Sequence, residues 1–236
     1  MKKTYTLVFI ALLSQLAINC SPIESTVSTT LTSTFKELND GISDDLEKFE
    51  ITMRYFSKDN FIGRPIPGYY ANKAFLTKEA ADALLRAQRD FIELGYRLKI
   101  YDAYRPQTAV NYFAAWATDL MDSKNKLQYY PNIDKSQLFA EGYIAARSGH
   151  SRGSAVDLTL VEIESGREVD MGSPWDFFDP ISWAENNQIT DQQQANRKLL
   201  ANIMVTHGFK PLKEEWWHFS FIAEPFPETY FDFPIN

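Results

Sequence analysis

Two histidines and two carboxylates, in two distant segments, have the types and spacing of a metal-dependent catalytic site. His150 and Asp157 lie seven residues apart in SGHSRGSAVDL. His218 follows Glu215 by three residues in EWWH. Two neutral imidazoles and one carboxylate are a common ligand set for catalytic zinc, which keeps a fourth position open for water.

Each of these residues also has a structural explanation when it is taken alone. A strand aspartate can bridge backbone groups, and a histidine beside two tryptophans can belong to an aromatic core. The combination favours the metal, because a buried Asp157 and His218 on two strands, with no positive partner, would carry a large desolvation cost.

Glu215 and Arg105 are the candidates for proton transfer and charge stabilisation. Residues three apart in a regular strand face opposite sides, so Glu215 and His218 converge only if the chain at Glu215 is irregular. If they converge, Glu215 is placed to take a proton from the attacking water; otherwise it is a surface carboxylate, and Glu214 competes for the role. Arg105, in YDAYRPQ, could donate to the oxygen on which charge develops. A salt bridge with Asp102 explains this arginine equally well.

Periodicity places the elements that must position these residues. TKEAADALLRAQRDFIELGY predicts an amphipathic helix that begins near Thr77 and stops at Gly95, with Ala80, Leu84, Ala87, Phe91 and Leu94 at helical spacing. RLKIYDAYR predicts a strand with Arg105 at its end, and Pro106 permits a new helix to about Ala117.

The segment that carries Asp157 reads as a strand from Ser154 to Ile163. Its alternation puts Val156, Leu158 and Leu160 on one face and Asp157 and Thr159 on the other. Gly153 allows a tight backbone path that could bring His150 toward Asp157. A turn at Gly166, a helix that ends at Gly208 and a strand from Trp216 to Ile222 complete the expected elements.

Composition sets the class of protein. The chain has 236 residues, 44% of them hydrophobic, which is enough for one core. Helices and strands alternate without a regular β-α-β rhythm, so we predict a single α+β domain with a mostly antiparallel sheet flanked by helices. The net charge is −7 and no Lys or Arg cluster interrupts it, so nucleic acid is not expected as a partner. No protein partner is implied.

The N-terminal segment MKKTYTLVFIALLSQLAINC is typical of an export signal. Its apolar run, from about Leu7 to Ile18, is shorter than a membrane span. The only cysteine, Cys20, stands where a lipid-bearing first residue of a bacterial lipoprotein would stand, although Asn19 precedes it where small residues are usual. An incidental thiol in a signal cut further on is the alternative. We therefore predict a signal peptide at 1–20, a flexible linker at 21–35 and the catalytic domain at 36–236.

GHSRGSAVDLTL, EWWH and YDAYRP together resemble the zinc D-alanyl-D-alanine dipeptidases of the VanX type, relatives of the D-alanyl-D-alanine carboxypeptidases. The similarity extends to DNFIGRPIPGY, YYPNID, MGSPWDFFD and YFDFP, and so covers nearly everything from about Tyr55 to the end. It implies a hedgehog/DD-peptidase-like fold with one Zn²⁺ per chain.

The resemblance also implies a role for each matching position. His150, Asp157 and His218 match the zinc ligands, Glu215 matches the catalytic base, and Arg105 matches the arginine that stabilises the tetrahedral intermediate.

Three further positions match residues of the substrate pocket. Asp176 matches a carboxylate that holds the substrate ammonium, and Ser148 and Tyr55 match other pocket residues. Phe113 is similar to an aromatic of the pocket wall, though helix packing explains it equally well.

The implied reaction is hydrolysis of the D-alanyl-D-alanine dipeptide to two D-alanines, in cell-wall peptide turnover. One alternative is a zinc D,D-carboxypeptidase or endopeptidase that trims peptidoglycan stem peptides, and another is a non-catalytic wall-binding lipoprotein. Many family members lack an export signal. The signal seen here implies a protein that is exported, either periplasmic or anchored to the membrane through lipidated Cys20, which makes glycopeptide resistance the less expected role.

Overall fold

The chain is described by a computed structural model that covers Met1 and residues 34–236. The predicted signal peptide, apart from Met1, and nearly all of the predicted linker lie outside the described residues. Residues 34–236 form one compact unit. None of the helices in the described part is long and apolar enough to cross a membrane.

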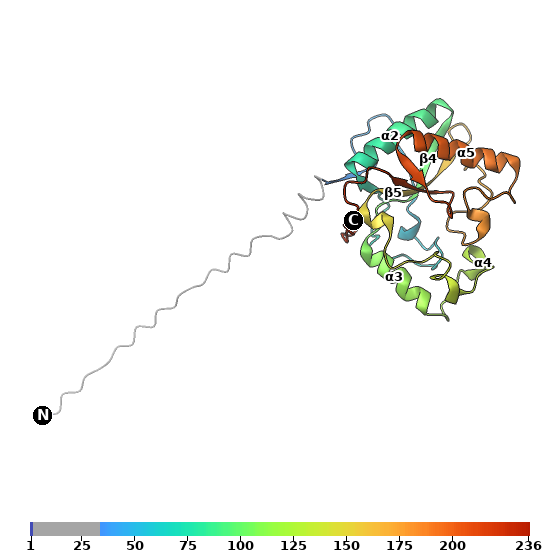
Figure 1. The fold of residues 1–236 in the computed structure, drawn as a ribbon. Coiled ribbons are helices and arrows are strands. Elements are labelled where there is room, and N and C mark those ends of the chain that lie inside the picture. The colour runs from blue at the N-terminus through green and yellow to red at the C-terminus, as the bar shows by residue number, and fades with distance from the viewer. Residues whose placement is uncertain (2–33) are drawn as a thin grey trace. The chain divides into compact units, whose positions relative to one another are not determined.

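A five-stranded mixed sheet runs through the middle of this unit (Figure 1). Its strands, in spatial order, are β2 (Glu50–Ile51), β4 (Tyr96–Asp102), β5 (Ala155–Glu162), β7 (His218–Phe221) and β6 (Phe209–Pro211). Only the β2–β4 pair is parallel. A second, two-stranded sheet pairs β1 (Phe35–Glu37) with β3 (Phe75–Thr77). The predicted α+β class with a mostly antiparallel sheet is confirmed.

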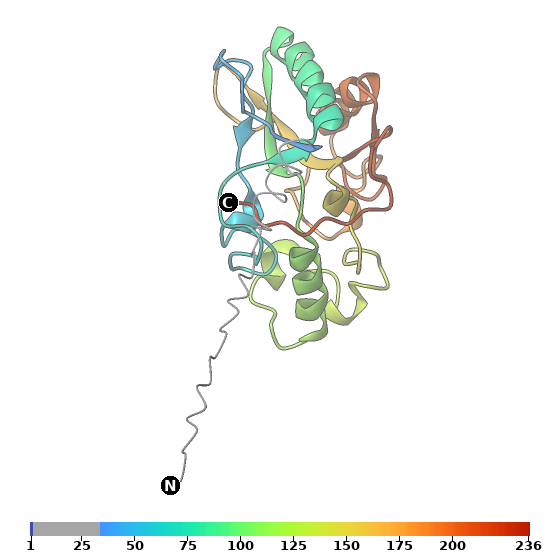
Figure 2. The ribbon, with the colours of Figure 1, turned by 90° about the vertical axis from the view of Figure 1, so that its left-hand side faces the viewer.

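Helices lie on both sides of the large sheet. α2 (Lys78–Glu93) and α5 (Asp191–Thr206) pack beside each other, while α3 (Gln107–Thr118) and the short α4 (Lys126–Tyr129) lie on the opposite side (Figures 1 and 2). Four of the residues predicted at helical spacing in α2 are fully buried: Ala80, Leu84, Ala87 and Phe91. The fifth, Leu94, is 54% exposed because the helix ends at Glu93 and Gly95 turns the chain at φ 87°.

The two faces of the sheet differ as the alternation in β5 predicts. Leu98 and Ile100 of β4 pair with Leu160 and Leu158 of β5, and all four are fully buried. They form the apolar face, which packs under α2 and α5. Asp157 projects from the other face, on the side of α3.

The last strand is shorter than predicted. β7 begins at His218 rather than Trp216, because the His218 N–H closes a turn on the Glu215 carbonyl (3.2 Å) and the Trp216 N–H donates to Ser182 (3.0 Å). The chain at Glu215 is therefore irregular, which is the condition for Glu215 and His218 to converge.

Candidate metal centre and active site

Three polar residues form a row across the site face of the sheet. Asp157 pairs with His218 on one side and with Asp102 on the other. A β-bulge in β4 makes the second pairing possible, because Ile100 faces Leu158 while Asp102, two residues later, faces Asp157. Without the extra residue, Tyr101, Asp102 would alternate onto the apolar face with Ile100.

His150 reaches the row from the turn that precedes β5. It lies in a short 3₁₀ helix, Gly149–Arg152, whose first turn is capped by Ser148 Oγ accepting from the His150 N–H (3.3 Å). Gly153 then takes φ 77°, and a Cβ there would come within 2.3 Å of the Phe35 ring. Only glycine fits this backbone path, as the sequence predicts.

Three donor atoms meet at one point. His150 Nε2 lies 3.0 Å from His218 Nδ1 and 3.2 Å from Asp157 Oδ1, and His218 Nδ1 lies 3.0 Å from the same oxygen. The Nδ1–H of His150 donates to the Ala103 carbonyl (2.7 Å), which leaves Nε2 with a free lone pair. His218 Nε2 lies 3.2 Å from Ser220 Oγ, so the opposite nitrogen of that ring turns inward.

This donor set fits a divalent metal ion. Tetrahedral ligands with bonds of about 2.0–2.1 Å stand about 3.3 Å apart, close to the separations of the three atoms. His150, Asp157 and His218 together form the group that could hold a metal among the described residues. Two nitrogens and one carboxylate oxygen suit zinc, with room for a fourth ligand.

The charges at this point favour an ionised carboxylate. Burial alone would raise the pKa of Asp157, but the charges and hydrogen bonds of His150 and His218 outweigh burial and lower it. Burial would likewise lower the pKa of His218, and the hydrogen bond to Asp157 raises it instead. Because the Asp157 carboxylate lies this close to the imidazole, it favours a positive charge next to it, either a proton on His218 or a bound cation.

Arg105 lies against the same row of residues. Its Nε donates to Asp102 Oδ2 (2.9 Å), while its Nη2 stays 3.9 Å from Asp157 Oδ2. The guanidinium lies over the rings of Tyr55 (5.0 Å) and Phe113 (5.3 Å). The salt bridge with Asp102 thus exists, and the rest of the arginine still faces the cavity.

Glu215 approaches His218 from the turn before β7. Its Oε2 lies 3.8 Å from His218 Nδ1. Burial, joined by the charge of Asp157, raises the pKa of Glu215, as is typical of a group that accepts and returns a proton. Glu214 does not line the same cavity.

Asp176 and Tyr55 form another wall of the site. The Tyr55 hydroxyl donates to Asp176 Oδ2 (2.6 Å). Asp176 is buried and has a left-handed backbone with φ 56°, which is unusual for a non-glycine residue and typical of functional sites. Burial, together with the charge of Asp157, raises the pKa of Asp176 well above its usual range. A cationic ligand would relieve this penalty.

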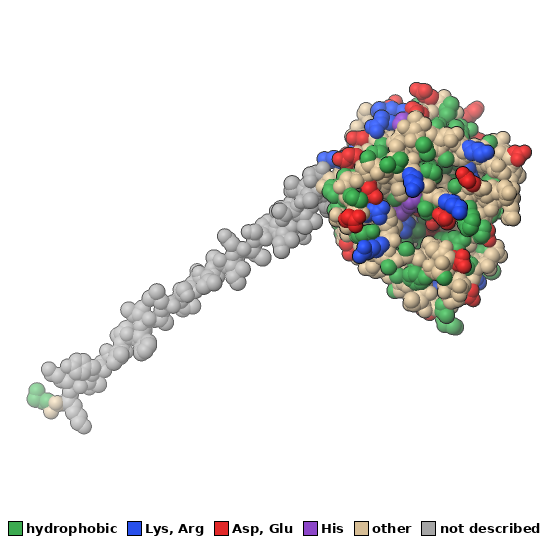
Figure 3. Space-filling view, in the orientation of Figure 1, with side chains coloured by type: hydrophobic (Ala, Val, Ile, Leu, Met, Phe, Trp, Pro, Cys, Tyr) green, Lys and Arg blue, Asp and Glu red, His purple; other side chains and the backbone are tan. Residues whose placement is uncertain are grey.

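A cavity of about 330 Å³ joins all these groups. It is lined by every site residue predicted from the sequence: Tyr55, Arg105, Ser148, His150, Asp157, Asp176, Glu215 and His218. Phe113 also contributes to the wall. In Figure 3 a histidine side chain lies in a hollow of the surface, with basic and acidic side chains around it.

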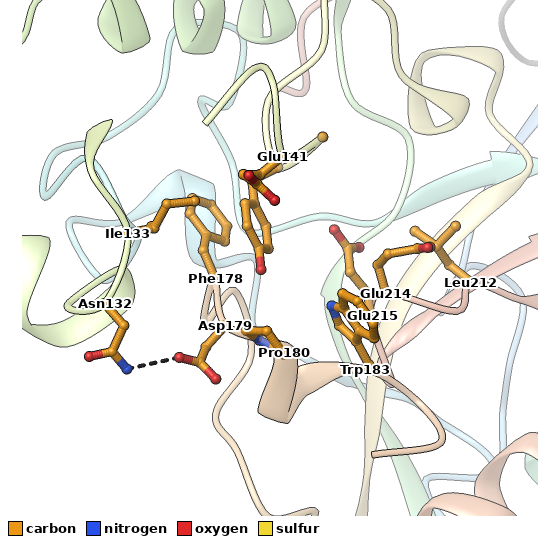
Figure 4. Close-up of a pocket in the computed structure, with 12 residues that line it drawn as sticks. Asn132, Ile133, Glu141, Phe178, Asp179, Pro180, Trp183, Leu212, Glu214 and Glu215 are labelled. Atoms are coloured by element: carbon orange, nitrogen blue, oxygen red, sulfur yellow. Dashed lines mark hydrogen bonds between the residues drawn. The ribbon is translucent and has the colours of Figure 1, made fainter. Parts of the chain in front are cut away.

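A larger pocket of about 570 Å³ (Figure 4) adjoins this cavity, and Tyr143, Phe178 and Glu215 are among the residues that line both. Tyr143 stacks on Phe178, with ring centres 5.1 Å apart. Glu141 reaches into the outer pocket from one side, and Glu214 and Glu215 reach in from another (Figure 4). Glu215 therefore lines both the cavity and the outer pocket.

Sequence reasoning missed two supporting residues, Trp175 and Ser220, and one contact of a third, Asp102. Trp175 donates its indole N–H to Asp157 Oδ2 (3.2 Å). Ser220 contacts His218, and Asp102 lies 3.6 Å from His150 Nδ1 in addition to pairing with Arg105. Their positions gave a weak signal, because each lies within a few residues of a predicted site residue.

Comparisons with known proteins agree with this geometry. The family model Peptidase M15, described as D-ala-D-ala dipeptidase, matches residues 40–236. A D-alanyl-D-alanine dipeptidase of Streptomyces coelicolor is 45% identical over 182 residues, 77% of this chain and 90% of the relative. Proteins of the same description from Enterococcus faecium and Escherichia coli K12 are 43% and 35% identical, over 78% and 72% of this chain and 91% and 77% of their own lengths. The chain is therefore a peptidase, a member of the Peptidase M15 family of D-ala-D-ala dipeptidases.

Proposed function

We propose that this protein is a zinc-dependent dipeptidase that hydrolyses D-alanyl-D-alanine to two D-alanines. One observation carries the proposal: the three donor atoms of His150, Asp157 and His218 open onto the cavity that also contains a base, a guanidinium and a buried carboxylate. The names of the relatives support the substrate.

The proposed cofactor is one Zn²⁺ per chain, held by His150 Nε2, Asp157 Oδ1 and His218 Nδ1. When bound, zinc would act as a Lewis acid on the peptide carbonyl and make the attacking water more acidic. The mixed imidazole and carboxylate donor set is what supports this metal over magnesium or calcium, which prefer oxygen ligands alone.

Glu215 and Arg105 supply proton transfer and charge stabilisation. Glu215 takes the proton from the attacking water and passes it to the leaving amine, a role that its raised pKa suits. Arg105 has its Nε on Asp102 and its Nη groups toward the cavity, where they can donate to the developing oxyanion.

The two ends of the substrate need different partners. Asp176, supported by the Tyr55 hydroxyl, accepts the ammonium of the dipeptide. Ser148 lines the same cavity and is a polar contact for the substrate. Since burial makes an unpaired Asp176 carboxylate unfavourable, a cation that pairs with it gains binding energy there. Recognition of a free ammonium excludes substrates that extend beyond it.

The setting of the reaction is also a proposal. The basic start, the apolar run from Leu7 to Ile18 and Cys20 support export, with lipid attachment at Cys20 as the anchor. An exported enzyme meets dipeptide released from the cell wall rather than the cytoplasmic pool of wall precursors. We therefore propose turnover of wall-derived dipeptide as its role.

The decisive experiment compares substrates with and without chelator. Purified zinc-loaded protein is assayed against D-Ala-D-Ala, L-Ala-L-Ala and a stem pentapeptide that ends in D-Ala-D-Ala. We expect chelator-sensitive hydrolysis of D-Ala-D-Ala alone. Faster cleavage of the pentapeptide would instead identify a carboxypeptidase, and zinc-loaded protein that cleaves none of them would be a binding protein.

Asp176→Asn separates the first two results. It keeps the size of the side chain and removes its charge, so we expect kcat/KM for the dipeptide to fall about 10- to 100-fold, as for loss of a charged hydrogen bond. A stem-peptide enzyme would keep its activity on the pentapeptide.

A further inference from the structure

Trp175 is buried between the candidate metal ligands and the candidate ammonium site. Its indole N–H donates to Asp157 Oδ2 (3.2 Å), and its ring packs on Tyr55, with ring centres 5.1 Å apart. Tyr55 in turn donates to Asp176, the next residue along the chain from Trp175. One side chain therefore contacts both halves of the site.

The hydrogen bond falls on the oxygen of Asp157 that faces away from the two histidines. Oδ1 is the atom near His150 Nε2 (3.2 Å) and His218 Nδ1 (3.0 Å). A carboxylate can bind a metal through one oxygen or through both, and a donor on the second oxygen favours the first mode. A single-oxygen ligand leaves the fourth position open for water.

The same oxygen is also the nearest carboxylate atom of Asp157 to Arg105. Arg105 Nη2 lies 3.9 Å from Oδ2, which is too far for a hydrogen bond. The indole N–H occupies one acceptor site of Oδ2, and Arg105, which is held at Nε by Asp102, lines the cavity beside it.

We propose that Trp175 is a positioning residue, whose indole N–H holds Asp157 as a one-oxygen ligand and keeps Arg105 available to the substrate. The proposal rests on the metal site of the proposed function and adds a determinant of its geometry. It is separable from packing, because a phenyl ring in place of the indole keeps an aromatic side chain and removes only the donor to Asp157 Oδ2.

Two substitutions of Trp175 distinguish the N–H from the bulk of the ring. Trp175→Phe keeps an aromatic ring and removes the donor. Trp175→His loses more of the packing, but its five-membered ring can place an N–H where the indole has one. Trp116→Phe is the matched control, since it makes the same chemical change at another buried tryptophan that does not line the cavity.

Zinc affinity is measured by competition with a chelator, without substrate. We expect Trp175→Phe to bind zinc about 10- to 100-fold more weakly than the parent, the usual effect of losing a partner of a metal ligand. We expect Trp175→His to recover most of the affinity although it is the less stable variant, and Trp116→Phe to match the parent. With cobalt in place of zinc, the visible absorption of Trp175→Phe should weaken, as expected when a second carboxylate oxygen enters the coordination sphere.

The ranking of the two variants decides the matter. If Trp175→Phe binds zinc as well as Trp175→His or better, or if its cobalt spectrum equals that of the parent, the proposal is wrong and Trp175 only fills space. Because each variant is compared with and without metal, a general loss of stability cancels in the zinc-dependent increase of Tm. Zinc-loaded parent protein that fails to cleave D-Ala-D-Ala would defeat the proposed function but leave this ranking readable.

Discussion

Asp102 shows how single residues of the site serve more than one neighbour. This fully buried carboxylate accepts from the Tyr69 hydroxyl (2.7 Å) and from Arg105 Nε (2.9 Å), and it lies 3.6 Å from His150 Nδ1. It balances the charge of Arg105 and lies beside the His150 ring, whose Nδ1–H donates to the Ala103 carbonyl. The sequence indicated Asp102 only as an alternative explanation for Arg105, because the second contact depends on the fold.

Two adjacent glutamates make a sharp comparison at this scale. Glu215 lines the inner cavity near His218, whereas Glu214 lines only the outer pocket. We predict that Glu215→Gln keeps its zinc and loses about 10²- to 10⁴-fold in kcat, the usual contribution of a general base. Glu214→Gln should stay within about twofold of the parent by the same measure.

Steady-state kinetics and metal content of both variants check this prediction. Loss of activity in Glu214→Gln, with Glu215→Gln unaffected, would exchange the two roles. Loss of zinc from Glu215→Gln would mean that Glu215 is itself a ligand.

At the scale of elements, local patterns predicted α2 and β5 because their periodicity is produced by the faces that they bury. The β4 bulge was beyond such reasoning. Strict alternation after Leu98 and Ile100 puts Asp102 on the apolar face, and the bulge at Tyr101 reverses this. Tyr101 donates to Glu168 (2.8 Å), a contact between residues far apart in the sequence. The role of a residue after such a bulge follows from tertiary partners that periodicity does not reveal.

The turn that presents His150 depends on one glycine. A Cβ at Gly153 would meet the Phe35 ring and would also be strained at φ 77°. We predict that Gly153→Ala lowers the free energy of unfolding by more than about 2 kcal/mol, since overpacking adds about 1–3 kcal/mol to the backbone strain. Gly166→Ala, at φ 67° with nothing within 4 Å of its added Cβ, should cost only about 1 kcal/mol.

Denaturant unfolding of the two variants measures this difference, and zinc affinity reports whether His150 moves. Equal decreases in the free energy of unfolding for the two variants would show that the Phe35 ring moves aside at no energetic cost.

Arg197 connects helix α5 to the loop that carries Asp176. Although it lies in a polar-looking stretch of α5, it is buried and donates to the carbonyls of Met171 (2.6 Å), Ile181 (3.0 Å) and Trp183 (2.7 Å). Burial lowers the pKa of Arg197 to about 10, so the side chain stays charged at neutral pH. The sequence of α5 alone does not indicate that Arg197 forms these hydrogen bonds to the loop.

We predict that Arg197→Met weakens both stability and substrate binding. Loss of the buried hydrogen bond to Met171 and of the two partly buried ones should lower the free energy of unfolding by about 3 kcal/mol, since one buried unpaired group costs about 1–3 kcal/mol. KM for the dipeptide should rise more than kcat falls, because Asp176 lies on the released loop. Lys198→Met, at the exposed neighbouring position, is the control; an unchanged KM in Arg197→Met would show that the loop holds its shape alone.

At the scale of the whole molecule, the site joins parts of the chain that are far apart. Its donors come from β5, from β7 and from the turn before β5, while Asp176 and Arg105 come from loops on the side of the sheet away from α2 and α5. Inside the cavity, Asp157, Asp176 and Glu215 lie near each other with Arg105 as a partly buried cation. A divalent ion would reduce the repulsion among these carboxylates and tie the segments together, so metal binding and folding should be coupled.

We predict that removing the metal lowers the Tm of the parent protein. At free zinc one hundred times its Kd, binding to the folded state alone contributes about 2.7 kcal/mol, which corresponds to about 5–10 °C in Tm for a domain of this size. His150→Ala and His218→Ala should lose both stoichiometric zinc and this zinc-dependent increase, because each removes one donor. Thermal scans with zinc and with chelator give the result directly. If chelator leaves the Tm of the parent protein unchanged, or if His218→Ala keeps the full zinc-dependent increase in Tm, these side chains do not bind a common ion.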